Sequence, residues 1–102
     1  MNPVKTKLKG KEKQMRVIQF TNSRGNAQAN HFVLIDQDNN AEYFQSYSSV
    51  IVRKLAGQIT LDEKYWNYSV TTSKHRNHYL GDSNEEVKSK IASGEYKLAN
   101  LN

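Results

Sequence analysis

The chain has 102 residues with 15 Lys and Arg, 10 Asp and Glu and no cysteine, and its formal net charge is +5 at pH 7. This length suffices for one domain with its own core, and the lack of cysteine excludes disulfides, thiolate metal sites and cysteine nucleophiles. No stretch approaches the ~18 apolar residues of a membrane span, and the lysine-rich start leads into no apolar signal segment. We therefore expect a cytoplasmic protein that does not associate with membranes.

The positive charge is concentrated at the start of the chain. Residues 1–26 carry seven Lys and Arg against one Glu, a net of +6, whereas residues 27–102 carry eight against nine Asp and Glu, a net of −1. Residues 1–13 contain too few apolar side chains to offset the entropy of ordering. The sequence therefore predicts a flexible lysine-rich arm over residues 1–13 and a single compact domain over residues 14–102.

The first two thirds of the domain read as strands separated by turns. Short β-rich or alternating segments predict strands, and clusters of Asn, Gly and Asp at 22–26 and 37–40 predict turns between them. The predicted strands cover residues 15–21, 30–36, 41–47, 49–55, 59–62 and 65–71. In the last of these, Trp66, Tyr68 and Val70 alternate with polar residues, which is the pattern of a half-buried strand. We accordingly expect Trp66, Tyr68 and Phe44 in the core.

The last third predicts two helices. Thr72 or Ser73 can cap a short helix that ends at Gly81. Ser83 and Glu86 form a capping-box pattern ahead of a second helix that Gly94 stops, and residues 95–101 then form a closing strand or an ordered tail. The fold class predicted is α+β: an antiparallel sheet of about five strands with one or two C-terminal helices packed on it.

The segment SKHRNHYLG, residues 73–81, is the densest group of functional side chains. His75 and His78 would share a helix face, and His31 is a conceivable third ligand. The sequence has neither a cysteine nor an HExxH pattern, however, so these histidines are weak evidence for a metal site. We expect no metal and no cofactor. We instead interpret Lys74 and Arg76 as residues that contact a partner, and we interpret Arg24, in a polar loop, in the same way. The candidate residues for binding nucleic acid or another partner are Lys5, Lys7, Lys9, Lys11, Lys13, Arg24, Lys74 and Arg76.

The sequence supports neither catalysis nor recognition of double-stranded DNA through its major groove. No spacing resembles a catalytic triad, and the paired acids fall in turns or at a helix start, so we expect no enzyme activity. The two C-terminal helices superficially resemble a helix-turn-helix, but the second one begins with Glu85 and Glu86. These acids would face the phosphates of a major groove, which argues against that mode of binding.

Four segments resemble a family of small uncharacterised proteins encoded by phages and mobile plasmids of Gram-positive bacteria. They are QFTNSRGN, EYFQSYSSVI, LDEKYWNYSVTTSKHRNHYLG and IASGEYKLANLN, and the resemblance extends from residue 19 to residue 102. The resemblance implies a setting in mobile elements, where small accessory proteins commonly act by binding. It carries no catalytic residue.

These observations together predict a non-enzymatic phage or mobile-element accessory protein that binds nucleic acid or a host nucleoprotein. The resemblance implies that the protein inhibits a host defence nuclease such as a CRISPR (Cas) effector. The alternative is a protein that holds single-stranded nucleic acid during replication, transfer or transcription.

Overall fold

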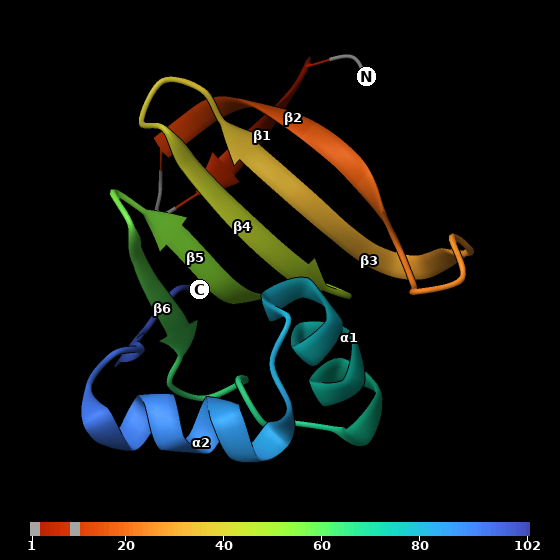
Figure 1. The fold of residues 1–102 in the computed structure, drawn as a ribbon. Helices are drawn as coiled ribbons and strands as arrows, with labels where there is room; N and C mark the ends of the chain where they lie inside the picture. Colours follow the sequence, from red (N-terminus) through yellow and green to blue (C-terminus); the bar gives the residue numbers. More distant parts are fainter. Residues whose placement is uncertain (1–2, 9–10) are drawn as a thin grey trace.

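One sheet and two helices make up the described part of the chain (Figure 1). The computed structural model describes the backbone of residues 3–8 and 11–102 and the side chains of residues 15–102. Within these residues, the strands lie in the sheet in the order in which they follow one another along the chain. The elements are β1 (Pro3–Leu8), β2 (Lys11–Thr21), β3 (Ala27–Asp36), β4 (Ala41–Ser46), β5 (Ser49–Leu55), β6 (Gln58–Asp62), α1 (Val70–Leu80), α2 (Asn84–Ser93) and β7 (Lys97–Ala99).

The predicted α+β class is confirmed, with two more strands in the described chain than expected. Strands β1 to β6 pair as successive antiparallel neighbours, and short turns join the successive strands from β2 to β6. After the two helices, β7 returns to pair with β6 in parallel. The helices form the crossover that a parallel connection requires, with α1 at the end of β4 and α2 leading back to β7 beside β6 (Figure 1).

The start of the chain differs from the sequence prediction of a flexible arm over residues 1–13. The backbone of residues 3–8 pairs with β2, with Val4 opposite Met15 and Lys5 opposite Gln14. A lysine at every second position is compatible with a strand. Apolar burial in this segment is too small to offset the entropy lost on ordering, but the hydrogen bonds between paired strands offset part of it. Residues 1, 2, 9 and 10, and the side chains of all five candidate lysines in this segment, lie outside the described residues.

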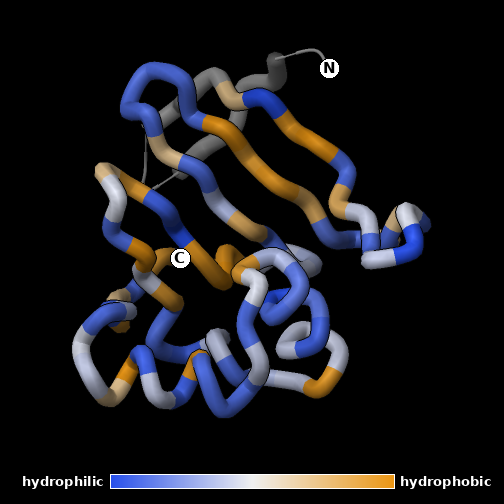
Figure 2. The backbone as a smooth tube through the Cα atoms, in the orientation of Figure 1, coloured by the Kyte–Doolittle hydropathy of each residue, from blue (hydrophilic) through white to orange (hydrophobic). Residues whose placement is uncertain are grey.

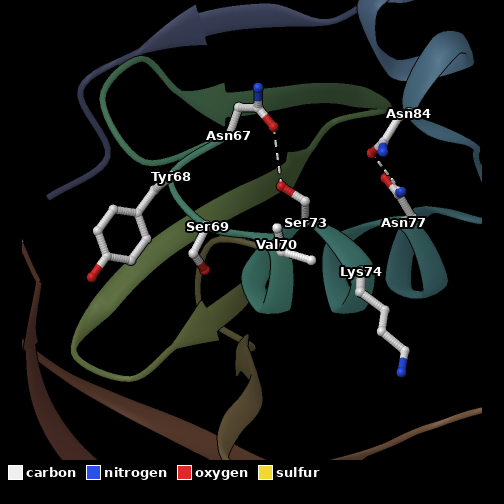
Figure 3. Close-up of a pocket in the computed structure, with 8 residues that line it drawn as sticks. All are labelled: Asn67, Tyr68, Ser69, Val70, Ser73, Lys74, Asn77 and Asn84. Carbon is white, nitrogen blue, oxygen red and sulfur yellow. Dashed lines mark hydrogen bonds between the residues drawn. The ribbon is translucent and has the colours of Figure 1, made fainter.

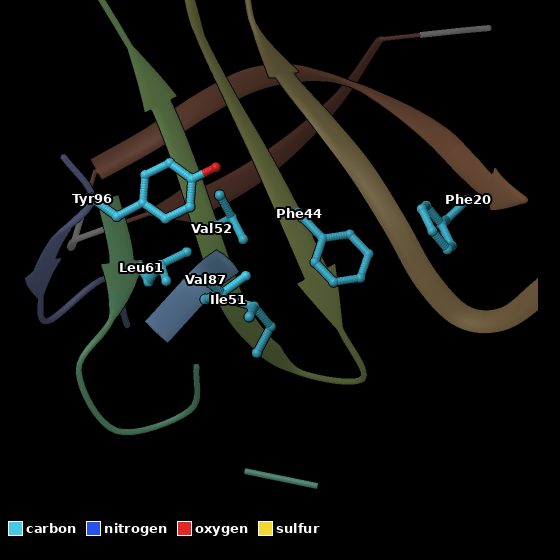
Figure 4. Close-up of a cluster of buried hydrophobic side chains, with 7 residues drawn as sticks. All are labelled: Phe20, Phe44, Ile51, Val52, Leu61, Val87 and Tyr96. Carbon is cyan, nitrogen blue, oxygen red and sulfur yellow. The ribbon is translucent and has the colours of Figure 1, made fainter. Parts of the chain in front are cut away.

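Two apolar clusters lie on opposite faces of the sheet. On β4, neighbouring residues alternate between the two clusters, so that Phe44 belongs to one and Tyr43 to the other. The first cluster lies between the sheet and the helices (Figure 4) and consists of Phe20, Phe44, Ile51, Val52, Leu61, Val87 and Tyr96. The second cluster consists of Met15, Leu34, Ala41, Tyr43, Val50 and Leu101. The chain end thus covers part of the sheet face that the helices leave open.

Helix α2 forms as its sequence predicts. The Ser83 backbone N–H donates to Glu86 Oε1 at 2.9 Å, and the Glu86 N–H donates to Ser83 Oγ at 3.1 Å, which completes the capping box. Gly94 ends the helix with a left-handed φ of 85°, which glycine adopts without a Cβ clash. Val87 is buried against the sheet and Ile91 packs beside it, as the four-residue spacing predicts.

The strand predicted over residues 65–71 is wrong. The Asp62 carboxylate accepts the backbone N–H groups of Lys64 and Tyr65 at 3.0 and 2.9 Å, so the chain turns away from the sheet directly after β6. Ser69 then caps α1 by accepting the Thr72 N–H at 3.1 Å, and the helix begins at Val70. The alternation of aromatic and polar residues therefore falls in a turn and a helix start.

Asp62 also joins the chain end to β6. Its buried carboxylate accepts the Leu101 N–H at 2.8 Å and the Asn102 side-chain amide at 3.0 Å, in addition to the two turn N–H groups. Burial raises the pKa of this carboxyl, but the four donated hydrogen bonds outweigh burial and hold the pKa below its usual value. The charged form is therefore the one that the fold stabilises.

We predict that Asp62→Ala lowers the free energy of unfolding by roughly 3 kcal/mol, because several partly buried donors lose their acceptor. Asp38→Ala, in the exposed turn between β3 and β4, should change it by less than about 0.5 kcal/mol. Since the pKa of Asp62 is lower in the folded chain, its contribution is complete above about pH 4 and is lost as the pH falls through the folded value. Urea unfolding followed by circular dichroism measures both effects, and equal losses for the two variants would contradict the assignment.

Candidate binding pocket

An open pocket lies where the loop after β6, helix α1 and the start of α2 meet (Figure 3). Its volume is about 760 Å³, and its lining residues are Asn67, Tyr68, Ser69, Val70, Ser73, Lys74, Asn77 and Asn84. Among these described side chains there is one cation and no carboxylate. In Figure 3, Asn67 lies on one side of Ser73, and the Asn77–Asn84 pair lies on the other. The pocket therefore combines amide groups, a lysine and an aromatic ring.

Tyr68 supplies the aromatic surface, which corrects the prediction that this residue lies in the core. Its side chain is 65% exposed, and the neighbouring Val70 is 87% exposed. The Tyr65 ring meets Tyr68 edge-on, with ring centroids 5.6 Å apart, and so supports the ring from within the loop. Trp66 is partly buried against the core cluster, and Phe44 is fully buried, as predicted.

Arg76 forms the interior support of the pocket, which corrects its prediction as a partner contact. The residue is 1% exposed, so its guanidinium is not available to a macromolecule in this structure. It donates to the Trp66 carbonyl in the loop, to Asn77 Oδ1 in α1 at 2.8 Å, and to Asn84 Oδ1 at the start of α2 at 2.9 Å. One side chain thereby links the three segments that form the pocket walls.

The positive charge of Arg76 has no carboxylate partner among the described side chains. Its acceptors are a backbone carbonyl and two neutral amides, and its guanidinium lies 5.4 Å from the centre of the Trp66 ring. Burial lowers the pKa of Arg76, yet an arginine stays protonated in proteins. The pocket therefore has a buried, uncompensated positive charge beneath its walls, where solvent screens it less than a surface charge.

Asp82, which precedes α2, and Glu86, in its first turn, are held in other contacts. Asp82 accepts from Lys90 Nζ at 2.9 Å and from the Tyr96 hydroxyl. Burial raises the pKa of Asp82, but these two partners outweigh it and lower the pKa overall, while burial and Asp82 together raise the pKa of Tyr96 to about 12. Glu86 is engaged in the capping box. Neither acid lines the pocket, so neither replaces the missing counter-ion of Arg76.

Of the other sequence candidates, Lys74 lines the pocket and Arg24 does not. Lys74 is exposed on α1, and its side chain extends away from Val70 and Ser73 at the edge of the pocket (Figure 3). Arg24 is exposed in the turn between β2 and β3, where its backbone N–H donates to Asn22 Oδ1 at 3.0 Å. The pocket residues that the sequence did not single out are Asn67, Tyr68, Asn77 and Asn84. These residues have amide or aromatic side chains and lie near Lys74 and Arg76 in the sequence. Their spacing follows no known binding motif.

The histidines form a structural cluster behind α1. The rings of His31 and His75 are both buried, with centroids 4.6 Å apart. Both nitrogens of His31 are engaged, Nδ1 with the Ala29 carbonyl at 2.9 Å and Nε2 with Ser46 Oγ at 3.0 Å. Burial, followed by the positive charges of nearby His and Lys side chains, lowers the pKa of His75. In the described part of the chain, no three His, Cys, Asp or Glu side chains are placed to hold a metal ion.

The Ser46–His31 pair superficially resembles the start of a catalytic triad. Both side chains are buried, however, and the Ser46 hydroxyl also lies 2.9 Å from Thr72 Oγ1 in the first turn of α1. His31 is oriented by a backbone carbonyl in place of a carboxylate. The hydroxyl is therefore closed to a substrate, and this chain of hydrogen bonds docks α1 onto the end of β4.

We predict that Arg76→Met lowers the free energy of unfolding by roughly 2–3 kcal/mol, because three carbonyl acceptors lose their donor. Trp66 is the single tryptophan of the chain, so the same variant should show greater quenching of tryptophan fluorescence by acrylamide as the loop is released. Lys74→Met, at an exposed position of the same helix, is the matched control. It should change neither the free energy of unfolding nor the quenching appreciably. Unchanged quenching in Arg76→Met would contradict the role of Arg76 as the link between the walls.

In the described part of the chain, no helix has the length and apolar character needed to cross a bilayer. Comparison with known proteins finds no match among curated proteins or solved structures. A model of a family of unknown function (DUF8033) matches residues 15–95. This range contains β3 to β6, both helices and all residues that line the pocket, and it leaves out the lysine-rich first 14 residues. The chain belongs to this family of unknown function, DUF8033.

Proposed function

We propose that this protein is a non-enzymatic accessory protein that binds single-stranded nucleic acid, free or within a nucleoprotein, through the pocket beside Tyr68. The observation that carries the proposal is the placing of an exposed aromatic ring and an exposed lysine on one open pocket that lacks carboxylates among its described lining residues. Aromatic rings that stack on bases, combined with cations that attract phosphates, are the common means of holding single strands.

The buried charge of Arg76 supports the same function. An uncompensated guanidinium costs folding free energy, and a ligand that brings negative charge or carbonyl oxygens to the pocket offsets part of this cost. Lys74 adds a mobile charge at the surface of the pocket. An electropositive pocket beside an aromatic ring suits a nucleotide better than it suits an apolar ligand.

A single strand suits this surface better than a duplex does. Tyr68 can stack only on a base that is unpaired or splayed out of a helix. Helix α2 begins with the exposed acids Glu85 and Glu86, which would repel phosphates if that helix entered a major groove. Residues 1–13, with five lysines and one glutamate, have a net charge of +4 and would add attraction that does not depend on base sequence.

The resemblance to phage and plasmid proteins supports a role against host defence. In that role the protein would occlude a host nuclease such as a CRISPR effector by contacting its guide RNA or another exposed strand. The runner-up is an accessory role in replication, transfer or transcription of the mobile element. Both roles require the same contact with a single strand, and they differ in the host process that is affected.

We predict that Tyr68→Ala weakens binding of a mixed-sequence single-stranded RNA by roughly tenfold or more, because the stacking surface is lost. Tyr68→Phe keeps the ring and should bind nearly as well as the unmodified protein. Fluorescence anisotropy with labelled RNA, single-stranded DNA and duplex DNA measures these affinities. If duplex DNA binds best, or if Tyr68→Ala binds as the unmodified protein does, the pocket is not the contact surface.

A charge comparison tests the role of Lys74. Lys74→Glu should weaken RNA binding and reduce its salt dependence, because a contact to the phosphates is replaced by repulsion. Lys88→Glu makes the same change of charge at an exposed position on α2 outside the pocket and should have a smaller effect. Equal losses in the two variants would indicate that general charge, and not the pocket, governs binding.

The anti-defence role predicts that expression of this protein raises the survival of a targeted plasmid in a Gram-positive host with an active CRISPR system. Tyr68→Ala should lose this protection. The variant should accumulate to the same level as the unmodified protein, because folding does not depend on the exposed ring. Full protection by Tyr68→Ala would separate the defence role from the pocket. Absence of any protection, with RNA binding retained, would favour the accessory role in replication or transfer.

A further inference from the structure

The orientation of two of the pocket amides, Asn77 and Asn84, is determined by Arg76. A guanidinium only donates hydrogen bonds, so the side-chain atom that faces it must be an oxygen. Arg76 lies 2.8 Å from Asn77 Oδ1 and 2.9 Å from Asn84 Oδ1. With its oxygen held there, Asn77 donates through Nδ2 to Asn84 Oδ1 at 2.8 Å. The oxygen of Asn84 therefore accepts two hydrogen bonds from within the protein.

The amide nitrogens at the two sides of the pocket are left without protein partners among the described residues. Asn84 Nδ2 is one of them. Asn67 is the other, because its Oδ1 accepts from Ser73 Oγ at 3.1 Å and its Nδ2 has no partner within the same residues. Lys74 Nζ is a further donor among the lining side chains. The amide oxygens are occupied: those of Asn67 and Asn84 by the hydrogen bonds drawn in Figure 3, and that of Asn77 by Arg76.

This pattern of donors distinguishes between nucleobases. Uracil and thymine carry O4, and guanine carries O6, at the position where cytosine and adenine carry an amino group that donates. A carbonyl oxygen can accept from Asn84 Nδ2 or Asn67 Nδ2. An amino group placed there would face another donor, and one of the two would lose its hydrogen bonds to water without replacement.

We infer that the pocket selects unpaired bases with a carbonyl oxygen at C4 of a pyrimidine or C6 of a purine, namely uracil, thymine and guanine, over cytosine and adenine, which carry an amino group at that position. The inference rests on the proposed binding of single strands and adds the class of base. Tyr68 favours a base over other carbonyl or acidic ligands, because its exposed ring lies on the same pocket as the donors. A carboxylate from a protein partner would satisfy the donors but would leave the ring without a stacking partner.

Oligouridine and oligocytidine of equal length test the inference on the full chain. The two polymers share their backbone, charge and ring size, and they differ at the base edge. We expect oligouridine to bind roughly fivefold or more tightly than oligocytidine. This is the effect expected when the first base gains one hydrogen bond and the second leaves that donor without an acceptor. Equal affinities would overturn the base preference while leaving single-strand binding in place. Failure of both polymers to bind would overturn the proposed function as well.

Asn84→Asp provides the matched variant. The carboxylate can still accept from Arg76 and Asn77, and an acid in the first turn of α2 is favourable, so the variant should fold with unchanged or higher thermal stability. It replaces the outward donor by an acceptor, and we expect the preference for oligouridine to shrink to less than about twofold. Asn67→Asp makes the same exchange in the loop and should act in the same direction.

Lys88→Gln is the control for charge, because it lowers the net charge by one, as Asn84→Asp does, at an exposed position outside the pocket. It should weaken the binding of oligouridine and oligocytidine alike and keep their ratio. If both Asp variants kept the full preference for oligouridine, the amide nitrogens would not be the groups that select the base, and the inference would be wrong.

Discussion

A buried guanidinium without a carboxylate partner is the constraint on which the pocket depends. Arg76 donates to the loop after β6, to α1 and to α2, so the relative positions of these three segments follow from the reach of one planar group. A carboxylate partner would neutralise the guanidinium and remove the positive potential from the pocket. Neutral carbonyl acceptors satisfy its hydrogen bonds and leave its charge in place. The same residue thus assembles the walls and determines which chemical groups face outward.

Helix α1 is positioned by polar contacts in addition to the packing of Tyr79 and Leu80 against the core cluster. Its buried residues are Thr72, Ser73, His75 and Arg76, and both helices are largely hydrophilic along their length (Figure 2). The Thr72–Ser46–His31 chain joins the first turn of α1 to β4, and Arg76 joins its middle to the loop and to α2. Hydrogen bonds are directional, so they specify the rotation of a helix more narrowly than apolar packing does. The outward face of α1 is thereby free to carry Lys74 and Val70.

Two groups of candidate binding cations lie in different parts of the chain. The lysines of residues 5–13 lie outside the range that matches the DUF8033 family, whereas Lys74 and Arg76 lie within it. A run of lysines attracts any polyanion, and its effect is screened by salt. A buried charge beneath oriented amides is screened less and acts at one place. Under the proposed function, the lysines of residues 5–13 would supply attraction over a distance, and the pocket would supply the choice of ligand.

The sequence by itself determined the features that depend on neighbours in the chain. These include the capping box of Ser83 and Glu86, the stop at Gly94, the turns between strands and the α+β class, because caps, turns and periodicity are local. The exposure of Tyr68, the burial of Arg76 and the orientation of Asn84 were decided by tertiary structure. Tyr68 is exposed because Asp62 turns the chain after β6, and Asp62 is held by a chain end about forty positions away in the sequence. Arg76 is buried where the loop after β6 and the start of α2 meet α1 and supply its acceptors. The sequence of residues 73–81 alone does not distinguish a surface arginine from one whose acceptors come from three segments.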